Sequence, residues 1–303
     1  MILPNTKTPS SILIAGCGDI GLRVAKHWLA KGATVSAISH SPQRRKSLTD
    51  QGITVCEHDL DQPLVAATLP TPPASLVYYF APPPPHGETD PRIAHLLTAL
   101  SERTPPDTVV YISTSGVYGN HNGGWVTEQT PPTPQTARAR RRLAAEQTLQ
   151  HWATTSQAKA IILRVGGIYG PGRLPLARLR QATPILHEAE APFSNRIHAD
   201  DLAAVCVAAS EHPRACGIYN VCDGHPSTMS DYFLTVARLA GLPQPPQISW
   251  DEAQQALSPE MLSYLRESRR LDITRMRNEL GVTLNYPTLE QGLAAALNEE
   301  GLP

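Results

Sequence analysis

Four arginines stand within five positions in the stretch TARARRRLAAEQ, which raises the question of what they bind. On a helix that turns roughly 100° per residue, Arg138, Arg142 and Glu146 fall inside a broad apolar arc. Arg140 points away from that arc and Arg141 lies at its edge, so both are expected on a solvated face. A charge inside a buried stripe needs an anionic or acceptor partner. We therefore predict a site role for at least one of Arg138 and Arg142; the alternative is an internal Arg142–Glu146 pair at i,i+4 spacing.

An arginine side chain is suited to some chemical roles and unsuited to others. The guanidinium stays charged at any accessible pH, so it cannot cycle a proton as a tyrosine does. It can clamp a carboxylate or phosphate, bind a ribose or pyrophosphate, or stabilise a developing oxyanion. The arginine stretch therefore predicts an anionic ligand near this helix.

A second group of residues with chemical meaning is the glycine loop in SILIAGCGDIGLRVAKHW. Gly16, Gly18 and Gly21 have the spacing G-x-G-x-x-G between an apolar strand and an amphipathic helix. The first glycine permits the tight turn, the second lets a pyrophosphate approach the backbone, and the third lets helix and strand pack closely. This context predicts dinucleotide binding, with Asp19 and Ile20 part of the binding loop.

The residues after the second strand indicate which dinucleotide is bound. NAD enzymes of this type place a carboxylate there, about 20 residues after the glycines, but this chain has Ser39. Ser39, Ser41 and Arg44 (or its neighbour Arg45) suit a 2′-phosphate, because guanidinium is a strong phosphate partner. We therefore predict NADP(H) in preference to NAD(H). Asp59, after the third strand, is a candidate partner for the adenine amino group.

Strands and helices alternate regularly through the first half of the chain. The apolar runs SILIAG, TVSAI, ITVCE, SLVYYFA, TVVYIST and AIILRV are separated by helical patterns at 19–31, 42–50 and 91–102, and from about 136. Such alternation predicts a doubly wound parallel sheet covered on both faces, a Rossmann-type α/β fold. Leu60 and Ala81 follow the third and fourth strands and are expected to line the cofactor site at the carboxyl ends of the sheet.

The alternation breaks near residue 172. We predict that 1–172 form the dinucleotide-binding domain, with 199–222 contributing back to it, and that 173–303 form mainly a smaller α-rich substrate lobe. The four prolines at 82–85 are expected to form a rigid loop beside the ligand end of the sheet.

Composition excludes several classes of protein. A formal charge of −1 over 303 residues provides no global field for polyanions, which argues against nucleic-acid binding. Five scattered cysteines without CxxC spacing fit a reducing compartment, so the cytoplasm is expected. The N-terminus shows no signal peptide, and no apolar run approaches the ~20 residues of a membrane helix. The histidines lack ligand spacing, so no metal is predicted.

Several motifs occur in the order found in one known family. They are the glycine loop, VYYFAPP, VVYISTSGVYG, ILRVGGIYGPG, RIHADDLAA, GIYNVCDG and the closing segment RLDITRMRNELGVTLNYPTLEQGLAAAL. Together they resemble the extended short-chain dehydrogenase/reductase superfamily, in its NAD-dependent epimerase/dehydratase group. The resemblance covers nearly the whole chain and implies the fold more firmly than the chemistry.

The resemblance also implies catalytic positions. Family members use a Ser or Thr, a Tyr, and a Lys four residues after that Tyr; the lysine also holds the nicotinamide ribose. Thr114 matches the first position. When the helix is aligned on Glu146, Arg142 stands where lysine belongs and Arg138 where tyrosine belongs. The Tyr-x-x-x-Lys pair is thus absent, and the proton would come from another group such as Tyr118, Tyr169 or water.

The same resemblance suggests substrate-binding positions. Gly167 stands where nucleotide-sugar enzymes often have a substrate-contacting asparagine, and Tyr118 lies in the STSGVYG motif. Asn195, Arg196 and His198 precede a helix that the family turns toward the substrate cleft. The alternative for these three is a capped helix start, with Asp200 or Asp201 favourable at the positive end of the helix dipole.

These observations lead to one main hypothesis and two alternatives. The main one is an NAD(P)-dependent oxidoreductase or epimerase/dehydratase-like enzyme for a small polar, anionic substrate. The first alternative is an inactive NADP(H)-binding sensor or scaffold; the second, nucleic-acid binding, is disfavoured because two of the four arginines fall on the buried stripe. No membrane partner is predicted, and superfamily analogy suggests a homodimer.

Overall fold

The computed structural model describes residues 9–302. Residues 1–8, on which the expectation of no signal peptide partly rests, and residue 303 lie outside the described residues. Within the described part no helix is long and apolar enough to cross a membrane.

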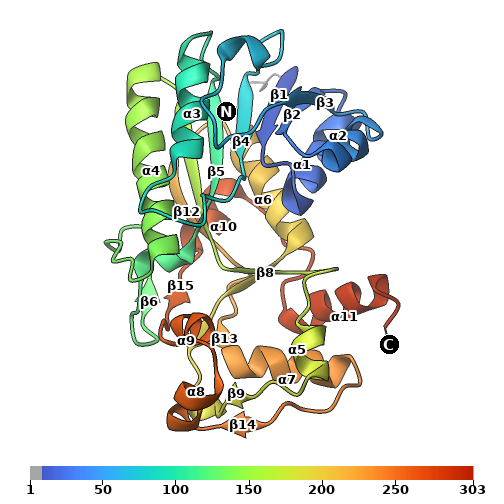
Figure 1. Ribbon diagram of the computed structural model, residues 1–303, viewed down its shortest axis with the longest axis vertical. Coiled ribbons are helices and arrows are strands. Elements are labelled where there is room, and N and C mark those ends of the chain that lie inside the picture. Colours follow the sequence, from blue (N-terminus) through green and yellow to red (C-terminus); the bar gives the residue numbers. More distant parts are fainter. Residues whose placement is uncertain (1–8, 303) are drawn as a thin grey trace.

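A seven-stranded parallel sheet forms the upper part of the molecule in Figure 1. Its order is β12-β7-β5-β4-β1-β2-β3. The strands are β1 (Ser11–Ala15), β2 (Thr34–Ser39), β3 (Thr54–Glu57), β4 (Leu76–Tyr79), β5 (Thr108–Thr114), β7 (Lys159–Val165) and β12 (Gly217–Val221). All six neighbouring pairs are parallel. The predicted Rossmann-type fold is confirmed, because crossover helices join these strands as the alternation indicated.

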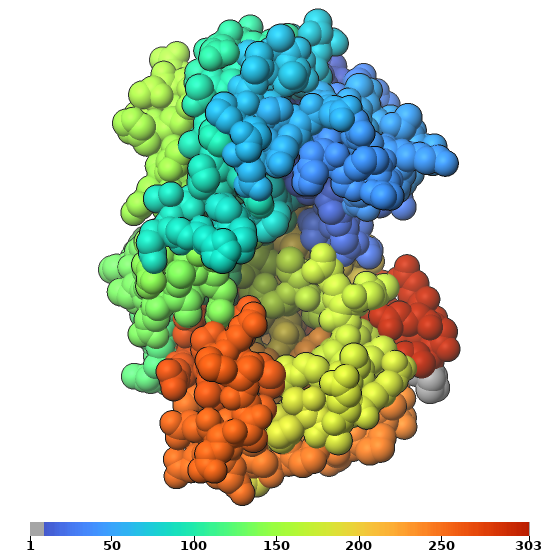
Figure 2. Space-filling model, in the orientation of Figure 1, coloured from blue at the N-terminus to red at the C-terminus, as the bar shows by residue number. Residues whose placement is uncertain are grey.

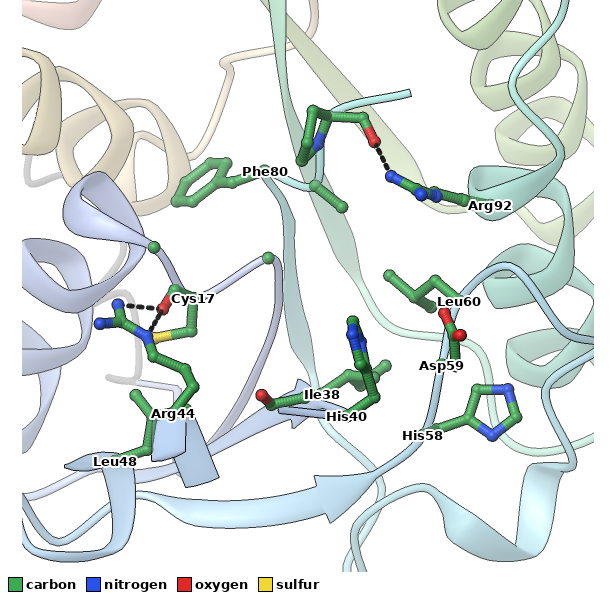
Figure 3. Close-up of a pocket in the computed structure, with 15 residues that line it drawn as sticks. Cys17, Ile38, His40, Arg44, Leu48, His58, Asp59, Leu60, Phe80 and Arg92 are labelled. Carbon is green, nitrogen blue, oxygen red and sulfur yellow. Dashed lines mark hydrogen bonds between the residues drawn. The ribbon is translucent and has the colours of Figure 1, made fainter. Parts of the chain in front are cut away.

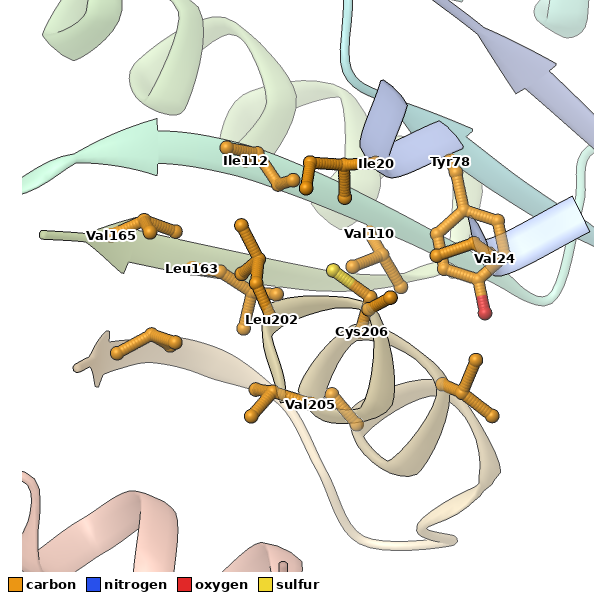
Figure 4. Packing of buried hydrophobic residues seen from close by; sticks show 14 of the residues in the cluster. Ile20, Val24, Tyr78, Val110, Ile112, Leu163, Val165, Leu202, Val205 and Cys206 are labelled. Carbon is orange, nitrogen blue, oxygen red and sulfur yellow. The ribbon is translucent and has the colours of Figure 1, made fainter. Parts of the chain in front are cut away.

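Helices cover both faces of this sheet. On one face, α1 (Asp19–Ala30) and α6 (Ala199–Glu211) pack against the sheet and each other, and α10 (Thr274–Leu280) completes the layer. On the other face lie α3 (Pro91–Ser101) and α4 (Ala137–Ser156), while α2 (Pro42–Thr49) lies beside β3. Figure 4 shows Ile20 and Val24 of α1 and Leu202, Val205 and Cys206 of α6 among the core side chains on the first face. The apolar spacing of α1 thus faces the sheet, as its period predicted.

The remaining elements form a smaller lobe, below the sheet in Figure 1. Its helices are α5 (Leu176–Arg180), α7 (Met229–Leu239), α8 (Trp250–Ala256), α9 (Pro259–Leu265) and α11 (Leu289–Glu299). Short strand pairs connect its segments: β9 (Ile185–Leu186) with β14 (Gln247–Ile248), and β10 (Phe193–Ser194) with β13 (Ser227–Thr228). Two further pairs tie the parts together: β8 (Gly167–Tyr169) with β11 (Arg196–His198), and β6 (Trp125–Val126) with β15 (Arg270–Leu271). Single turns of 3₁₀-helix occur at Ala66–Thr68, Ser115–Tyr118 and Glu188–Glu190.

The chain returns to the sheet after entering the lobe. Residues 199–222 contain α6 and β12. Leu271, Ile273, Met276 and Leu280 also belong to the core cluster under the sheet, although they fall within the range 173–303. The division into two domains stays a prediction, and this returning segment adds to the larger part.

Candidate functional site

The glycine loop joins β1 to α1, and each glycine has a distinct local reason. Gly16 has φ +88°, and a Cβ there would lie 2.2 Å from the backbone nitrogen of Ala81. A Cβ on Gly21 would lie 3.0 Å from the Gly16 carbonyl oxygen, so this glycine permits close packing of helix and strand. A Cβ on Gly18 would meet nothing within 4 Å. This space at the N-terminus of α1 fits a pyrophosphate, because unpaired backbone N–H groups attract anions there.

A cavity of about 390 Å³ opens beside this loop (Figure 3). Seven of the predicted cofactor residues line it: Gly16, Gly18, Ser39, Arg44, Asp59, Leu60 and Ala81. His40, His58, Phe80 and Arg92 also line it and were missed by the sequence analysis. The first three directly follow a strand of the sheet, which is the signal that could have identified them.

The basic side chains at this cavity differ in how they are held. Arg44 donates from Nε and Nη2 to the carbonyl oxygen of Cys17, at 3.0 and 2.5 Å. Arg45 instead forms an ion pair with Glu57, so of the two candidate arginines Arg44 lies at the cavity. Among the described residues that line the cavity, Asp59 is the only carboxylate.

Three predicted cofactor residues have other contacts. Ser41 caps α2, where its hydroxyl accepts a hydrogen bond from the Arg44 N–H. The Asp19 carboxylate forms ion pairs with Arg23 and Arg173, at 2.9 and 2.8 Å. Ile20 is buried in the core. Neither Asp19 nor Ile20 lines the cavity.

A second cavity of about 190 Å³ lies between the sheet and the lobe. Figure 2 shows a hollow between the upper part and the yellow-green and orange segments of the lobe. Five predicted site residues from distant parts of the chain line this substrate cleft: Thr114, Arg138, Gly167, Asn195 and Arg196. Ser115, Tyr264, Glu267 and Arg269 line it too and were missed. The charged cluster RESRR near α9 contains two of them, but its pattern alone did not indicate a site.

The two arginines of the buried arc, Arg138 and Arg142, have different surroundings. Arg138 lines the substrate cleft, with its guanidinium 3.7 Å from the centre of the Tyr264 ring. It donates to the Ser263 hydroxyl at 3.1 Å. Arg142 donates to the Ile112 carbonyl oxygen at 2.9 Å and lines neither cavity. The geometry therefore places Arg138 in the cleft and Arg142 against β5.

One expectation about the same helix, and one alternative, are corrected. Arg141 was expected on a solvated face, yet it is buried and donates to the Gly87 carbonyl oxygen at 2.8 Å. The loop after β4 lies over this side of α4, and Arg140 also reaches that loop through an ion pair with Glu88. The helical angle of Arg141 could not reveal this cover, because the loop comes from 54 residues earlier in the chain.

The second correction concerns Glu146. Its partner is Arg164 of β7, at 2.7 Å and nearly fully buried, and the alternative pair with Arg142 does not form. Ser113 of β5 also donates to the Glu146 carboxylate at 2.5 Å. Glu146 therefore ties α4 to two central strands.

Three residues expected near the substrate serve internal contacts. Asn195 donates to the Arg269 carbonyl oxygen and accepts from the Leu271 N–H, which braces the cleft wall. His198 is the N-cap of α6, where Nδ1 accepts from the Asp200 N–H at 3.2 Å. Tyr118 is fully buried and donates to Asn220. His198 and Tyr118 do not line the cleft, so the helix-cap alternative describes His198.

The two tyrosines suggested as proton donors in place of the family's catalytic tyrosine lie outside the cleft. Tyr118 and Tyr169 are both fully buried and neither lines the cleft. Burial raises the pKa of both phenols, which disfavours proton release. Tyr264 is the tyrosine that lines the cleft among the described residues, and it is 48% exposed.

Residues 9–302 contain neither a metal-binding cluster nor a disulfide bond. No group of three or more His, Cys, Asp or Glu side chains there could hold a metal ion, and the prediction of no metal stays a prediction. All five cysteines are without a disulfide partner within the same residues.

The chain matches a known family model and resembles curated proteins. The model of the NAD dependent epimerase/dehydratase family matches residues 12–222. Protein YeeZ of Escherichia coli (strain K12) is 29% identical over 194 residues, which are 63% of this chain and 62% of YeeZ. The chain thus spans about three fifths of the length of this curated relative.

Solved structures give a similar result over more of the chain. A functionally unknown conserved protein from Silicibacter pomeroyi superposes with a TM-score of 0.83 and 30% identity, covering 96% of this chain and 99% of that one. The UDP-glucose 4-epimerase of Thermotoga maritima, with UDP-glucose, superposes with a TM-score of 0.78 and 18% identity, covering 96% and 98%. The second similarity shows the shared fold alone.

Proposed function

The chain belongs to the NAD-dependent epimerase/dehydratase family, and from this premise we propose an NAD(P)-dependent oxidoreductase or epimerase-like enzyme for a small polar, anionic substrate. One observation carries the proposal: a glycine loop with room for a pyrophosphate, and a cleft that contains Thr114 and three arginines, both lie at the carboxyl ends of strands of the same parallel sheet. When bound, a nicotinamide dinucleotide supplies a carbon that accepts or delivers hydride.

The side chains of the cleft have separate roles in this proposal. The Thr114 hydroxyl oxygen accepts from the Gly116 N–H at 3.1 Å, which leaves its proton available to a substrate oxygen. Arg138 stabilises negative charge on that oxygen, as a positive group already in position does. Tyr264 holds the proton that arginine cannot supply. In this proposal, Arg138 stabilises the charge and Tyr264 donates the proton, two roles that the catalytic tyrosine of the family performs alone.

The preferred cofactor in the proposal is NADP(H). Ser39, His40 and Arg44 line the cavity at the end of β2, where an NAD enzyme has a carboxylate. Arg44 uses two of its nitrogens on Cys17 and retains Nη1 for a 2′-phosphate.

Calorimetric titration of the purified chain with NADPH and NADH tests this proposal directly. We expect micromolar binding of NADPH and at least tenfold weaker binding of NADH. Arg44→Ala should weaken NADPH binding at least tenfold and leave NADH unchanged, whereas the control Arg45→Ala should change neither. Equal affinities would reject the preference for NADP(H), tighter binding of NADH would assign NAD instead, and no binding of either dinucleotide would reject the proposed function.

A non-catalytic NADP(H) sensor is the second candidate. It is favoured by the absence of the Tyr-x-x-x-Lys pair and by the contact of Arg142 with the backbone of β5. A sensor should bind NADPH, turn over no substrate in a panel, and change its oligomeric state or conformation on binding. Light scattering with and without NADPH measures that response and also tests the proposed homodimer.

The proposed location is the cytoplasm. Its support is the five cysteines without a disulfide partner among the described residues, four of which are buried.

A further inference from the structure

The substrate cleft carries an excess of positive charge. Arg138, Arg196 and Arg269 line it, and Glu267 is the one carboxylate among the described residues that do so. Arg269 is paired with Glu267 at 2.9 Å and also donates to the Gly119 carbonyl oxygen at 2.6 Å. Two guanidinium groups therefore remain without a carboxylate partner in the cleft.

Arg196 is the less satisfied of these two. Its guanidinium stacks on the Tyr232 ring at 3.5 Å, and Nη2 lies 3.2 Å from the sulfur of Met229. Its Nε is buried and has no hydrogen-bond partner within residues 9–302. Burial lowers the pKa of Arg196, and the nearby carboxylates of Asp223 and Asp231 offset that effect only in part. A half-buried guanidinium that contacts a sulfur and a ring, with no carboxylate bonded to it among the described residues, is suited to bind an anion.

A smaller cavity of about 110 Å³ adjoins the cleft, because Met229 and Tyr264 line both. Its other walls are mostly apolar and include Ile185, Leu186, Phe233, Leu257, Met261 and Leu265. Apolar cavities of ~150 Å³ bind a benzene ring, so this smaller one, of about 110 Å³, has room for a branched alkyl group or for part of an aryl ring.

Polar groups in the smaller cavity are few and partly used. The Ser230 hydroxyl donates to the Leu186 carbonyl oxygen at 2.7 Å. Arg178 stacks on the Phe233 ring at 4.6 Å and leaves its Nε without a partner among the described residues. A nucleobase needs several hydrogen-bond partners at its edge, and this cavity has too few to offer. It fits an apolar group that carries at most one polar substituent.

We propose that the substrate is an organic anion with an aryl or branched alkyl group: its carboxylate or phosphate binds Arg196, and its apolar group fills the cavity lined by Leu186, Phe233 and Met261. This rests on the proposed function, because it names the substrate class of the same cleft. It differs from the UDP-glucose named for the Thermotoga maritima neighbour. The charge and the apolar group act together, since Met229 lies at the boundary of both cavities.

Calorimetry with small probes tests this substrate class, with and without saturating NADP⁺. We expect 3-phenylpropionate to bind with a submillimolar Kd. Propionate, which lacks the ring, and 3-phenylpropanamide, which lacks the charge, should bind at least tenfold more weakly. Phenethyl phosphate distinguishes the two anions, because the tighter of it and 3-phenylpropionate identifies the headgroup. The proposal is overturned if the amide equals the acid, if neither aryl anion binds below 10 mM, or if UDP-glucose binds more tightly than both.

Three variants locate the two halves of the ligand. Arg196→Met should weaken 3-phenylpropionate at least tenfold, whereas Arg180→Met, an exposed arginine on α5 outside both cavities, should not. Met261→Trp fills the apolar cavity and should weaken 3-phenylpropionate while leaving propionate unchanged. An unchanged affinity in Arg196→Met, or an equal loss for both acids in Met261→Trp, would contradict the assignment.

The NADPH titration separates this inference from the proposed function. All three variants should retain wild-type NADPH affinity, which also shows that they fold. If the wild-type chain binds NADPH but not 3-phenylpropionate, the proposed substrate class is wrong and the proposed function is unaffected. Absence of NADPH binding in the wild-type chain rejects the proposed function, while acid binding then still reports on the cleft.

Discussion

Residues of the same type have different roles at this site, because their surroundings differ. Gly16 and Gly18 are two positions apart, but one has the backbone of Ala81 against it and the other faces open space. Arg138 and Arg142 are one helical turn apart, but one lines the cleft and the other is bound to the backbone of β5. The same residue type therefore has separable effects on folding and on binding.

The glycine pair gives the first prediction. Gly16→Ala should reduce the stability by more than about 3 kcal/mol, because φ is +88° and its Cβ would lie 2.2 Å from the Ala81 nitrogen. Gly18→Ala should keep the wild-type stability and lose at least tenfold in NADPH affinity, because its Cβ enters only the space for the pyrophosphate. Urea denaturation and calorimetry measure the two effects. A Gly18→Ala chain that unfolds early would show that this glycine is structural.

The second prediction concerns the proton donor. Tyr264→Phe should lower kcat roughly 10²-fold or more on a substrate that the chain turns over, with a smaller effect on KM. The stacking on Arg138 is retained because the ring remains. Tyr286→Phe, a tyrosine outside the cleft, is the matched control. An unchanged kcat and pH–rate profile in Tyr264→Phe would assign the proton to water.

At the scale of elements, α4 is held by contacts that differ in burial. Its inner face carries Glu146, which binds Arg164 and Ser113 of the central strands. Elsewhere on the helix, the exposed Arg140 and the buried Arg141 bind the loop after β4. That loop also supplies Pro82 to the wall of the cofactor cavity. The arginine helix therefore positions one wall of the cofactor site and, through Arg138, one wall of the substrate cleft.

Two ion pairs on this helix provide the third prediction. Glu146→Gln should cost about 3–5 kcal/mol of unfolding free energy, because Arg164 would remain buried without a compensating charge. Glu88→Gln breaks the exposed pair with Arg140 and should leave the urea midpoint almost unchanged, because solvent screens that pair. The midpoints of urea denaturation measure both. Similar losses in the two variants would show that burial does not decide the strength of the pairs.

At the scale of the whole molecule, the site exists because the lobe meets the ligand end of the sheet. The cleft takes Thr114 from β5, Arg138 from α4, Arg196 from β11 and Tyr264 from α9. Asp223, just after β12, lies at this junction. The Asp223 N–H donates to the Arg196 carbonyl oxygen, and the Arg277 side chain donates to the Asp223 carbonyl oxygen. Burial raises the pKa of Asp223 to about 7, although Arg196 and Arg277 oppose the shift.

The fourth prediction follows from this carboxyl group. Its folded pKa is above its unfolded value of about 3.9, so between these values the folded chain binds more protons than the unfolded chain. The group therefore destabilises the fold increasingly as pH rises through this window, and fully above pH 7. Asp223→Asn removes this dependence, so its stability relative to wild type should rise by about 2 kcal/mol from pH 5 to pH 8. Denaturation at several pH values measures the difference; parallel curves would contradict the raised pKa.

The sequence by itself determined the sheet, its crossover helices, the glycine loop and the inward direction of Arg138. These features depend on local spacing: two-residue and 3.6-residue periods and three glycines at fixed intervals. Tertiary structure decided the rest. Arg141 is buried because a loop 54 residues away covers it, and Glu146 binds Arg164 on a neighbouring strand. Tyr264, Glu267 and Arg269 join the cleft only in the folded chain. There Arg138 of α4 contacts Ser263 and Tyr264, and Arg269 donates to the Gly119 carbonyl oxygen, each across more than 100 residues of sequence. A local pattern specifies which way a side chain points, but only the folded chain specifies what it meets.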